Sequence, residues 1–131
     1  MSTQEDFNIE VRVRYSECDP MNVAHHSAYP VWMEIARVEM LRQRGTAYRE
    51  LEERGIFFVV ARLSIRYRRP AKYDDILQVR VRRLPSAGVK VDHEYEIHRG
   101  RELIATAETT IVCVDRQGKL QPVPAGTLGT D

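Results

Sequence analysis

The chain has 131 residues, of which 43% are apolar and 30% charged, as is ordinary for a globular domain. Its formal net charge is only +1, which argues against a nucleic-acid-binding protein held by bulk positive charge. The N-terminus is polar and acidic rather than apolar, and no apolar run approaches the about 18 residues that span a bilayer. We therefore expect a cytoplasmic protein with no membrane span.

One domain is predicted over residues 1–131, with a core from about 7 to 120 and loose ends at 1–6 and 121–131. The two cysteines, Cys18 and Cys113, have no CxxC spacing, so reduced thiols are expected.

The first third of the chain predicts a strand, a loop and a long helix. Apolar and polar residues alternate from Phe7 to Tyr15, which is typical of a half-buried strand. Turn-forming residues fill Ser16–Ala28, and a helix is predicted over Tyr29–Arg44, with Ser27 as its N-cap and Gly45 as its stop. The wide apolar stripe of this helix predicts burial over much of its surface. Its members are Val31, Ile35, Val38 and Leu41, extended by Trp32, Ala36 and Met40.

The rest of the chain predicts a sheet. A short helix over Thr46–Glu53 precedes four strands, predicted over Phe57–Tyr67, Ile76–Leu84, Val89–His98 and Leu103–Val114. Successive strands without intervening helices favour an antiparallel meander. The first strand must join this sheet, and the long helix must cover its apolar face. The fold class is therefore α+β, an antiparallel sheet wrapped around one long central helix.

The stretch from Tyr15 to Tyr29 is the best candidate for a reactive site. Asp19 lies in a turn that ends near the N-terminus of a buried helix, where free backbone N–H groups and the positive end of the helix dipole can bind an oxyanion. A carboxylate beside such donors can attack an acyl carbon or activate a water. Spacing alone does not distinguish this role from turn chemistry, which is the more frequent role of Asp before Pro.

Two segments together resemble a known family. The first contains Tyr15, Asp19, Val23, His26 and Tyr29 and continues into the helix VWMEIARVEMLRQRG, and the second is FVVARLSIRYRRPAKYDDILQV. Over about residues 8–115 the chain resembles the 4-hydroxybenzoyl-CoA thioesterase-like hotdog family. The usual glycine of the loop is replaced by Asn22, a residue type that also adopts left-handed backbone conformations.

The resemblance implies a hotdog fold and hydrolysis of an acyl-CoA thioester. It implies that Asp19 attacks the thioester carbonyl or acts as base on water, while the His26 backbone N–H stabilises the oxyanion. It also implies a homodimer or homotetramer with the active site at a subunit interface, and no cofactor besides the coenzyme A of the substrate. The residues expected to bind substrate are Tyr15, Asn22, Val23, His25, Tyr29, Arg68, Arg69 and Lys90.

Several alternatives stay open from the residues alone. Cys18 could be a nucleophile with His25 or His26 as base, and Glu17 could raise the pKa of Asp19 or simply be a solvated carboxylate. No third ligand accompanies the two histidines, so no metal site is expected. A thioesterase acting on an acyl-carrier protein and a non-catalytic acyl-CoA-binding module are the rival functions. Further basic residues could meet phosphates or merely keep strand faces in solution: Arg66, Lys72, Arg82 and Arg83.

Overall fold

The computed structural model describes residues 6–85 and 88–124. In chain order the elements are β1 (Asp6–Arg12), the 3-10 helix η2 (Tyr15–Glu17), α1 (Ala28–Gln43), α2 (Tyr48–Glu53), β2 (Phe57–Tyr67), β3 (Ile76–Arg83), β4 (Lys90–Arg99) and β5 (Glu102–Val114). These bounds confirm the predicted helices and the four later strands to within one or two residues. Among the described residues no helix has both the length and the apolar character needed to cross a membrane. The cytoplasmic location stays a prediction.

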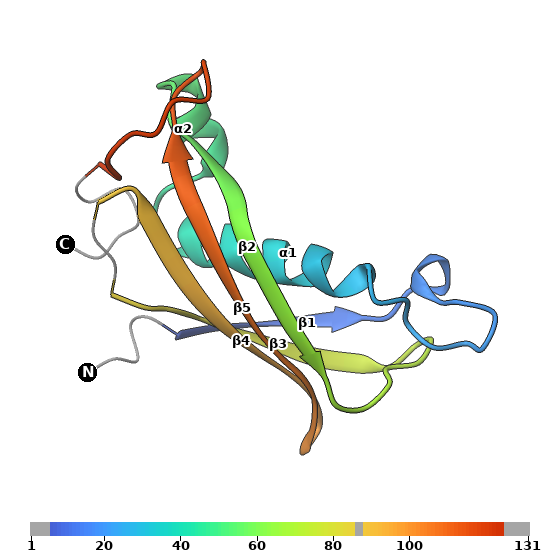
Figure 1. The fold of residues 1–131 in the computed structure, drawn as a ribbon. Helices are drawn as coiled ribbons and strands as arrows, with labels where there is room; N and C mark the ends of the chain where they lie inside the picture. Colours follow the sequence, from blue (N-terminus) through green and yellow to red (C-terminus); the bar gives the residue numbers. More distant parts are fainter. Residues whose placement is uncertain (1–5, 86–87, 125–131) are drawn as a thin grey trace.

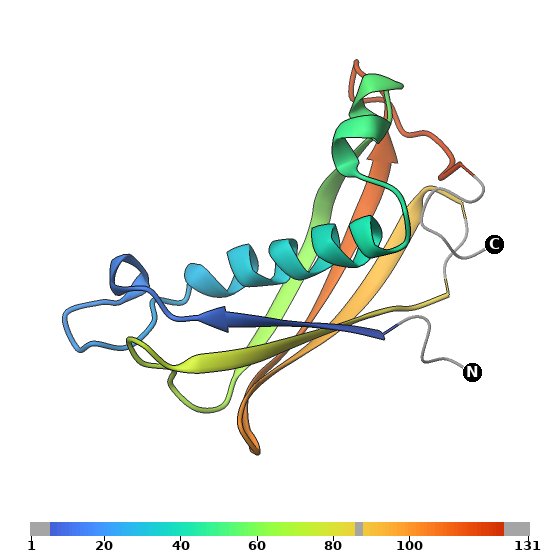
Figure 2. The ribbon, with the colours of Figure 1, turned by 180° about the vertical axis from the view of Figure 1, so that it is seen from behind.

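The five strands form one antiparallel sheet in the order β1-β3-β4-β5-β2. The prediction of a four-strand meander is correct for β3, β4 and β5 but wrong for β2, which pairs with β5 instead of β3. The reason is that β3 already uses its two edges for β1 and β4, so β2 can add only to the free edge of β5. The sheet curves around α1, which lies against one of its faces (Figures 1 and 2).

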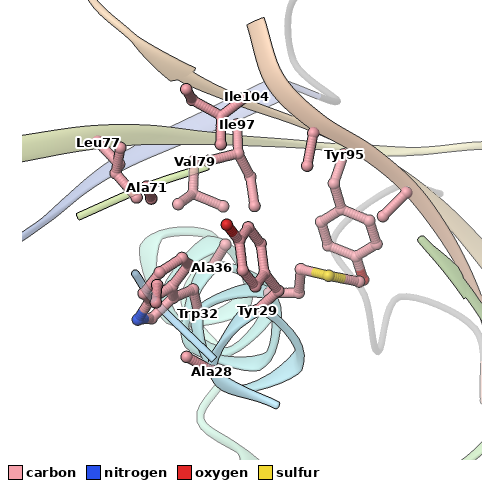
Figure 3. Close-up of a cluster of buried hydrophobic side chains, with 14 of the residues drawn as sticks. Ala28, Tyr29, Trp32, Ala36, Ala71, Leu77, Val79, Tyr95, Ile97 and Ile104 are labelled. Carbon is pink, nitrogen blue, oxygen red and sulfur yellow. The ribbon is translucent and has the colours of Figure 1, made fainter. Parts of the chain in front are cut away.

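The core lies between α1 and the sheet. Figure 3 shows Tyr29, Trp32 and Ala36 of α1 facing side chains of the strands. Alternate residues of the strands are buried there, including Leu77 and Val79 of β3. Most of the predicted apolar stripe of the helix is buried or half-buried, as expected, but Val31 and Ile35 are 45% and 41% exposed. Within this chain, α1 has more apolar surface than the sheet covers.

Strand β2 is an edge strand with apolar side chains open to solvent. Val60 and Leu63 are exposed although the alternation of residues predicts that this strand has a buried face. Their neighbours across the ladder, Ile111 and Thr109, lie on the helix side of β5, so Val60 and Leu63 also point to that side. They are exposed because no strand lies beyond β2 and no part of the described chain covers its outer half.

The ends of the predicted domain differ from expectation in detail. Asp6, placed in the loose N-terminal segment, begins β1 and forms an ion pair with Arg80 at 2.8 Å. In the segment predicted to be a loose tail, the Gln121 N–H donates to the Cys113 carbonyl, and the Val123 N–H donates to the Gly88 carbonyl. The remainder of that predicted tail, 125–131, and residues 86–87 of the predicted turn lie outside the described residues.

Candidate active site

The loop that carries Asp19 joins β1 to α1 and projects from one end of the molecule (Figure 1). Strand β1 ends at Arg12, so the prediction that it continues to Tyr15 is wrong. The reason is local: the Glu17 carboxylate accepts the Arg14 backbone N–H at 2.8 Å, which turns the chain into η2 and stops the ladder. Tyr15 is therefore 78% exposed, and its ring meets the Tyr73 ring edge-on at 5.7 Å.

Asp19 holds its own loop in a tight turn. Its Oδ1 accepts hydrogen bonds from the backbone N–H groups of Met21 at 2.9 Å and Val23 at 3.2 Å. Its backbone N–H donates to the Val23 carbonyl, and its carbonyl accepts the Asn22 N–H. Within residues 6–85 and 88–124, Oδ2 has no hydrogen-bonding partner. One carboxylate oxygen is thus structural, whereas the other is available for chemistry.

Asn22 occupies the position where a left-handed backbone is required. Its φ is 65°, a conformation that is favourable for Gly and tolerated by Asn but costly for most other residues. Asn22 thus adopts the left-handed conformation that its residue type tolerates.

A second loop, residues 68–75 between β2 and β3, packs against the Asp19 loop and is called the support loop. The Ala24 N–H donates to the Ala71 carbonyl at 2.7 Å, and Val23 forms a bridge with Lys72. The support loop is itself anchored by Arg99, which binds Asp75 at 2.6 Å and the Pro70 carbonyl at 3.1 Å. Sequence reasoning assigned no role to Arg99, since its partners lie in a distant segment of the chain.

Glu17 is not the solvated carboxylate that one sequence interpretation predicted. Its side chain is only 9% exposed and accepts a hydrogen bond from Trp32 Nε1 at 3.0 Å and another from Arg14 at 3.1 Å. Burial alone would raise the pKa of Glu17, but the hydrogen bonds from Arg14 and Trp32 outweigh it and lower the pKa. The ionised carboxylate therefore ties the loop to α1.

The N-terminus of α1 offers a free donor beside this loop. The Tyr29 N–H donates to the His26 carbonyl, whereas the His26 N–H has no hydrogen-bonding partner among the described residues. Ser27 occupies the N-cap position as predicted, but its side chain does not cap the helix. Its Oγ lies 2.8 Å from His25 Nδ1 instead, which leaves the helix N-terminus uncapped by a side chain.

Aromatic side chains surround this helix end. Tyr29 is buried, with its ring 4.8 Å from that of Trp32 and edge-on to Tyr67 at 4.9 Å. Burial raises the pKa of Tyr29, although a hydrogen bond with the Ala71 backbone partly offsets the effect. Tyr67 Oη donates to the His26 carbonyl at 3.2 Å and so holds the residue expected to supply the oxyanion donor. Sequence reasoning missed this role of Tyr67. The position of Tyr67 at the end of its strand was the one feature of the sequence that could have indicated it.

The predicted basic ligands lie at two different places. The backbone N–H groups of Arg68 and Arg69 donate to the Ile104 carbonyl, and both side chains are exposed next to the support loop. Lys90 pairs with Val112 of β5, whereas the end of β2 pairs with Ala105, so Lys90 lies roughly 24 Å away along the strand. One chain alone therefore does not bring Lys90 to the Asp19 loop.

The alternative nucleophile has an unfavourable environment. Desolvation of Cys18, followed by the charges of Asp19 and Glu17, raises the pKa of this thiol and disfavours the reactive thiolate. The ring centroids of His25 and His26 lie 4.1 Å apart, with the two rings tilted by 35° to one another. In the ranges 6–85 and 88–124 no group of three or more His, Cys, Asp or Glu side chains could hold a metal ion.

Two arginines are buried. Arg37 of α1 is 7% exposed and donates to Tyr95 Oη at 2.9 Å. Arg83, expected on an exposed strand face, is also buried, because its position on β3 continues the inward series of Leu77, Val79 and Val81. Arg82, on the opposite face, is exposed as expected.

Comparison with known proteins agrees with this architecture. Residues 13–129 match the model of a family described as the thioesterase-like superfamily. The acyl-CoA thioesterase YbgC of Haemophilus influenzae is 36% identical over 118 residues, which cover 89% of this chain and 86% of that protein. The acyl-CoA thioester hydrolase YbgC of Escherichia coli is 32% identical over 110 residues, covering 83% of this chain and 82% of that one.

Solved structures agree as well. The crystal structure of a DHNA-CoA thioesterase from Staphylococcus aureus matches with a TM-score of 0.83 and 25% identity, over 92% of this chain and 81% of that one. Likeness to such structures confirms the predicted hotdog fold, with one antiparallel sheet around a long helix. On this sequence and structural similarity, the chain belongs to the thioesterase-like superfamily.

Proposed function

We propose that this protein hydrolyses an acyl-CoA thioester to a free acid and coenzyme A, with Asp19 as nucleophile or general base. The observation that carries the proposal is that one loop contains both a carboxylate oxygen and a backbone N–H group that form no hydrogen bond. Asp19 Oδ2 and the His26 N–H have no hydrogen-bonding partner among the described residues, and both belong to the segment that enters α1. The names of the two YbgC relatives support acyl-CoA as the substrate class.

Two routes fit this arrangement. In the first, Asp19 Oδ2 attacks the thioester carbon, the C–S bond breaks, the thiolate of coenzyme A leaves, and water hydrolyses the resulting anhydride. In the second, Asp19 takes a proton from a water whose oxygen attacks the same carbon, and the C–S bond then breaks with release of the coenzyme A thiolate. In both, negative charge develops on the thioester oxygen, and the His26 N–H at the positive end of α1 stabilises it. Neither route uses a metal or a redox cofactor.

We further propose that the working unit is a homodimer or homotetramer in which β2 strands of two chains pair. Strand β2 is a long edge with exposed apolar residues, and such edges favour pairing with another chain. The same pairing would cover apolar surface on α1, where Val31 and Ile35 are exposed. A second subunit would also enclose the Asp19 loop, which is open to solvent in one chain.

Contacts to the substrate are assigned by position. Tyr15, Asn22, Val23, His25 and Tyr29 belong to the loop and the start of α1, where the thioester and the acyl group would lie. Arg68 and Arg69 stand beside the support loop, where their guanidinium groups can meet the phosphates of coenzyme A. Lys90 is too distant in the same chain and would serve a site only from the partner subunit.

Release of free thiol from a panel of aromatic and aliphatic acyl-CoA thioesters tests the proposal. We expect turnover of at least one substrate, and we expect Arg68→Ala to raise KM for acyl-CoA with little change in kcat. The matched substrate is the same acyl group on pantetheine, which lacks the nucleotide and should be insensitive to this substitution. Turnover only of acyl groups carried on an acyl-carrier protein would favour that rival, and binding without any turnover would identify a non-catalytic module.

A further inference from the structure

A small polar cavity lies at the end of α1 opposite the Asp19 loop. It is enclosed by the last turns of α1, the start of α2 and the inner face of β3, β4 and β5. Its polar lining residues are Arg37, Arg44, Tyr48, Arg83 and His93. The cavity volume is about 10 Å³, which is close to the room needed for one water-sized species.

Three buried nitrogen atoms of this cavity lack a partner. Arg37 Nε, Arg44 Nη1 and His93 Nδ1 are shielded from solvent and form no hydrogen bond in the described structure. Arg37 and His93 are 7% and 4% exposed as whole residues, so bulk water does not satisfy them. A buried donor without a partner costs about 1–3 kcal/mol, and more when the group is charged. All three atoms belong to side chains that line this one cavity.

The charge of the lining indicates which kind of species would bind. Guanidinium groups stay protonated in proteins, and neither Arg37 nor Arg44 forms an ion pair with a carboxylate among residues 6–85 and 88–124. Burial raises the pKa of Tyr48 and also that of Tyr95, so both hydroxyls are neutral at physiological pH. Buried positive charge without compensation is costly, and an anion would provide the compensation.

The donors are held in place before any ligand arrives. Arg37 Nη1 donates to Tyr95 Oη at 2.9 Å, and that oxygen lies 2.7 Å from Thr109 Oγ1. This chain of hydrogen bonds fixes the plane of the Arg37 guanidinium from α1 to β4 and β5, so its Nε–H direction is fixed too. Burial, and after it the positive charges of Arg37, Arg83 and Arg44, lower the pKa of His93 to about 3, so this ring adds no positive charge to the cavity at neutral pH.

We propose that this cavity binds a single small anion of the halide type, such as chloride, between Arg37 Nε, Arg44 Nη1 and His93 Nδ1. The cavity volume excludes larger anions such as phosphate or a nucleotide, so the site is separate from substrate binding. The bound ion would connect the end of α1 to β4 and thereby stabilise the fold in proportion to the ion concentration. This inference concerns stability and does not depend on the proposed thioesterase activity.

Crystals of the protein grown in sodium bromide provide the direct test, because bromide replaces chloride and scatters anomalously. We expect one anomalous peak within hydrogen-bonding distance of Arg37 Nε and His93 Nδ1. A water molecule at that place, with no anomalous signal at saturating bromide, would overturn the proposal. This measurement uses the wild-type protein and so does not depend on any variant being folded.

Thermal unfolding gives an independent test in solution. At constant ionic strength, replacing sodium gluconate by sodium chloride should raise the melting temperature of the wild type by about 3 °C, since only the small anion fits the cavity. Arg44→Gln should abolish this chloride dependence. Arg42→Gln is the matched control, because Arg42 lies on the same helix but pairs with Glu39 on the surface. Equal chloride dependence in both variants would contradict the proposed site.

Discussion

Trp32 Nε1 donates a hydrogen bond of 3.0 Å to Glu17 Oε2, and this contact ties the loop that carries Asp19 to α1. The two residues are 15 positions apart and belong to different elements. The position of Asp19 relative to the helix N-terminus therefore depends on a buried carboxylate that takes no part in the proposed chemistry.

The Glu17–Trp32 contact should support both stability and activity. Trp32→Phe keeps the aromatic packing but removes the donor, so the free energy of unfolding should fall by about 1–2 kcal/mol. kcat should fall as well because the Asp19 loop loses its link to α1. Urea denaturation and steady-state kinetics of Trp32→Phe, Glu17→Gln and the double variant measure this. Strictly additive losses would show that the two side chains are not coupled.

Asp19→Asn should separate the chemical role of the residue from its structural role. The amide oxygen of the introduced asparagine can keep the hydrogen bonds from Met21 and Val23, so the fold should be retained while kcat falls by about a hundredfold or more. Asp19→Ala removes both functions and should lower stability by about 1 kcal/mol as well. Thiol release and thermal unfolding are the measurements. A folded Asp19→Asn variant with near-normal turnover would remove Asp19 from the mechanism.

Asn22 should be replaceable by glycine but not by alanine. With φ at 65°, Asn22→Gly relieves backbone strain and should leave the melting temperature and kcat nearly unchanged. Asn22→Ala places a Cβ in a left-handed conformation and should destabilise the protein by about 1 kcal/mol. Comparison of the two variants by chemical denaturation decides the matter. If alanine is tolerated as well as glycine, the turn does not need its present geometry.

The apolar edge of β2 should control assembly. Light scattering at micromolar concentration should give at least a dimer for the wild type, and Leu63→Arg should shift the mass toward that of one chain by placing charge at the proposed interface. Gln117→Arg, on the exposed turn after β5, is the matched control and should keep the wild-type mass. A wild-type protein with the mass of one chain would contradict the proposed pairing.

His93 should make stability fall in mildly acidic solution. Because burial and the neighbouring arginines lower its pKa from 6.5 to about 3, the unfolded chain binds a proton below about pH 6.5 that the folded chain does not bind. The free energy of unfolding should therefore decrease as pH falls from about 6.5 to about 4.5, by up to about 1.4 kcal/mol per pH unit. Above pH 6.5 His93 is neutral in both states and adds no slope.

Urea denaturation in gluconate buffer at several pH values tests the His93 prediction. His93→Gln should lose this slope, whereas His98→Gln, at a half-buried position next to Glu96, should keep it. An unchanged slope in His93→Gln would assign the acid sensitivity to another group.

The sequence by itself determined the elements and the place of the candidate site. Period-two alternation located β3, β4 and β5 within one or two residues, because each strand buries one face and the pattern of a single strand records this. The Tyr15–Tyr29 stretch likewise identified the loop that we propose to be reactive, since its turn residues and the following helix start are local features. Even the tolerance of Asn22 for a left-handed backbone is a property of the residue type.

The tertiary structure alone decided which segments meet. That β2 adds to β5 depends on the edges of β3 being occupied, which no single strand pattern reveals. The hydrogen bonds of the buried Glu17 and Arg37 side chains reach Trp32 and Tyr95, which lie 15 and 58 residues away along the chain. Hydrogen bonds and charge effects act over a few ångströms in space, so residues far apart in sequence carry no local signal of the contact that the fold creates between them.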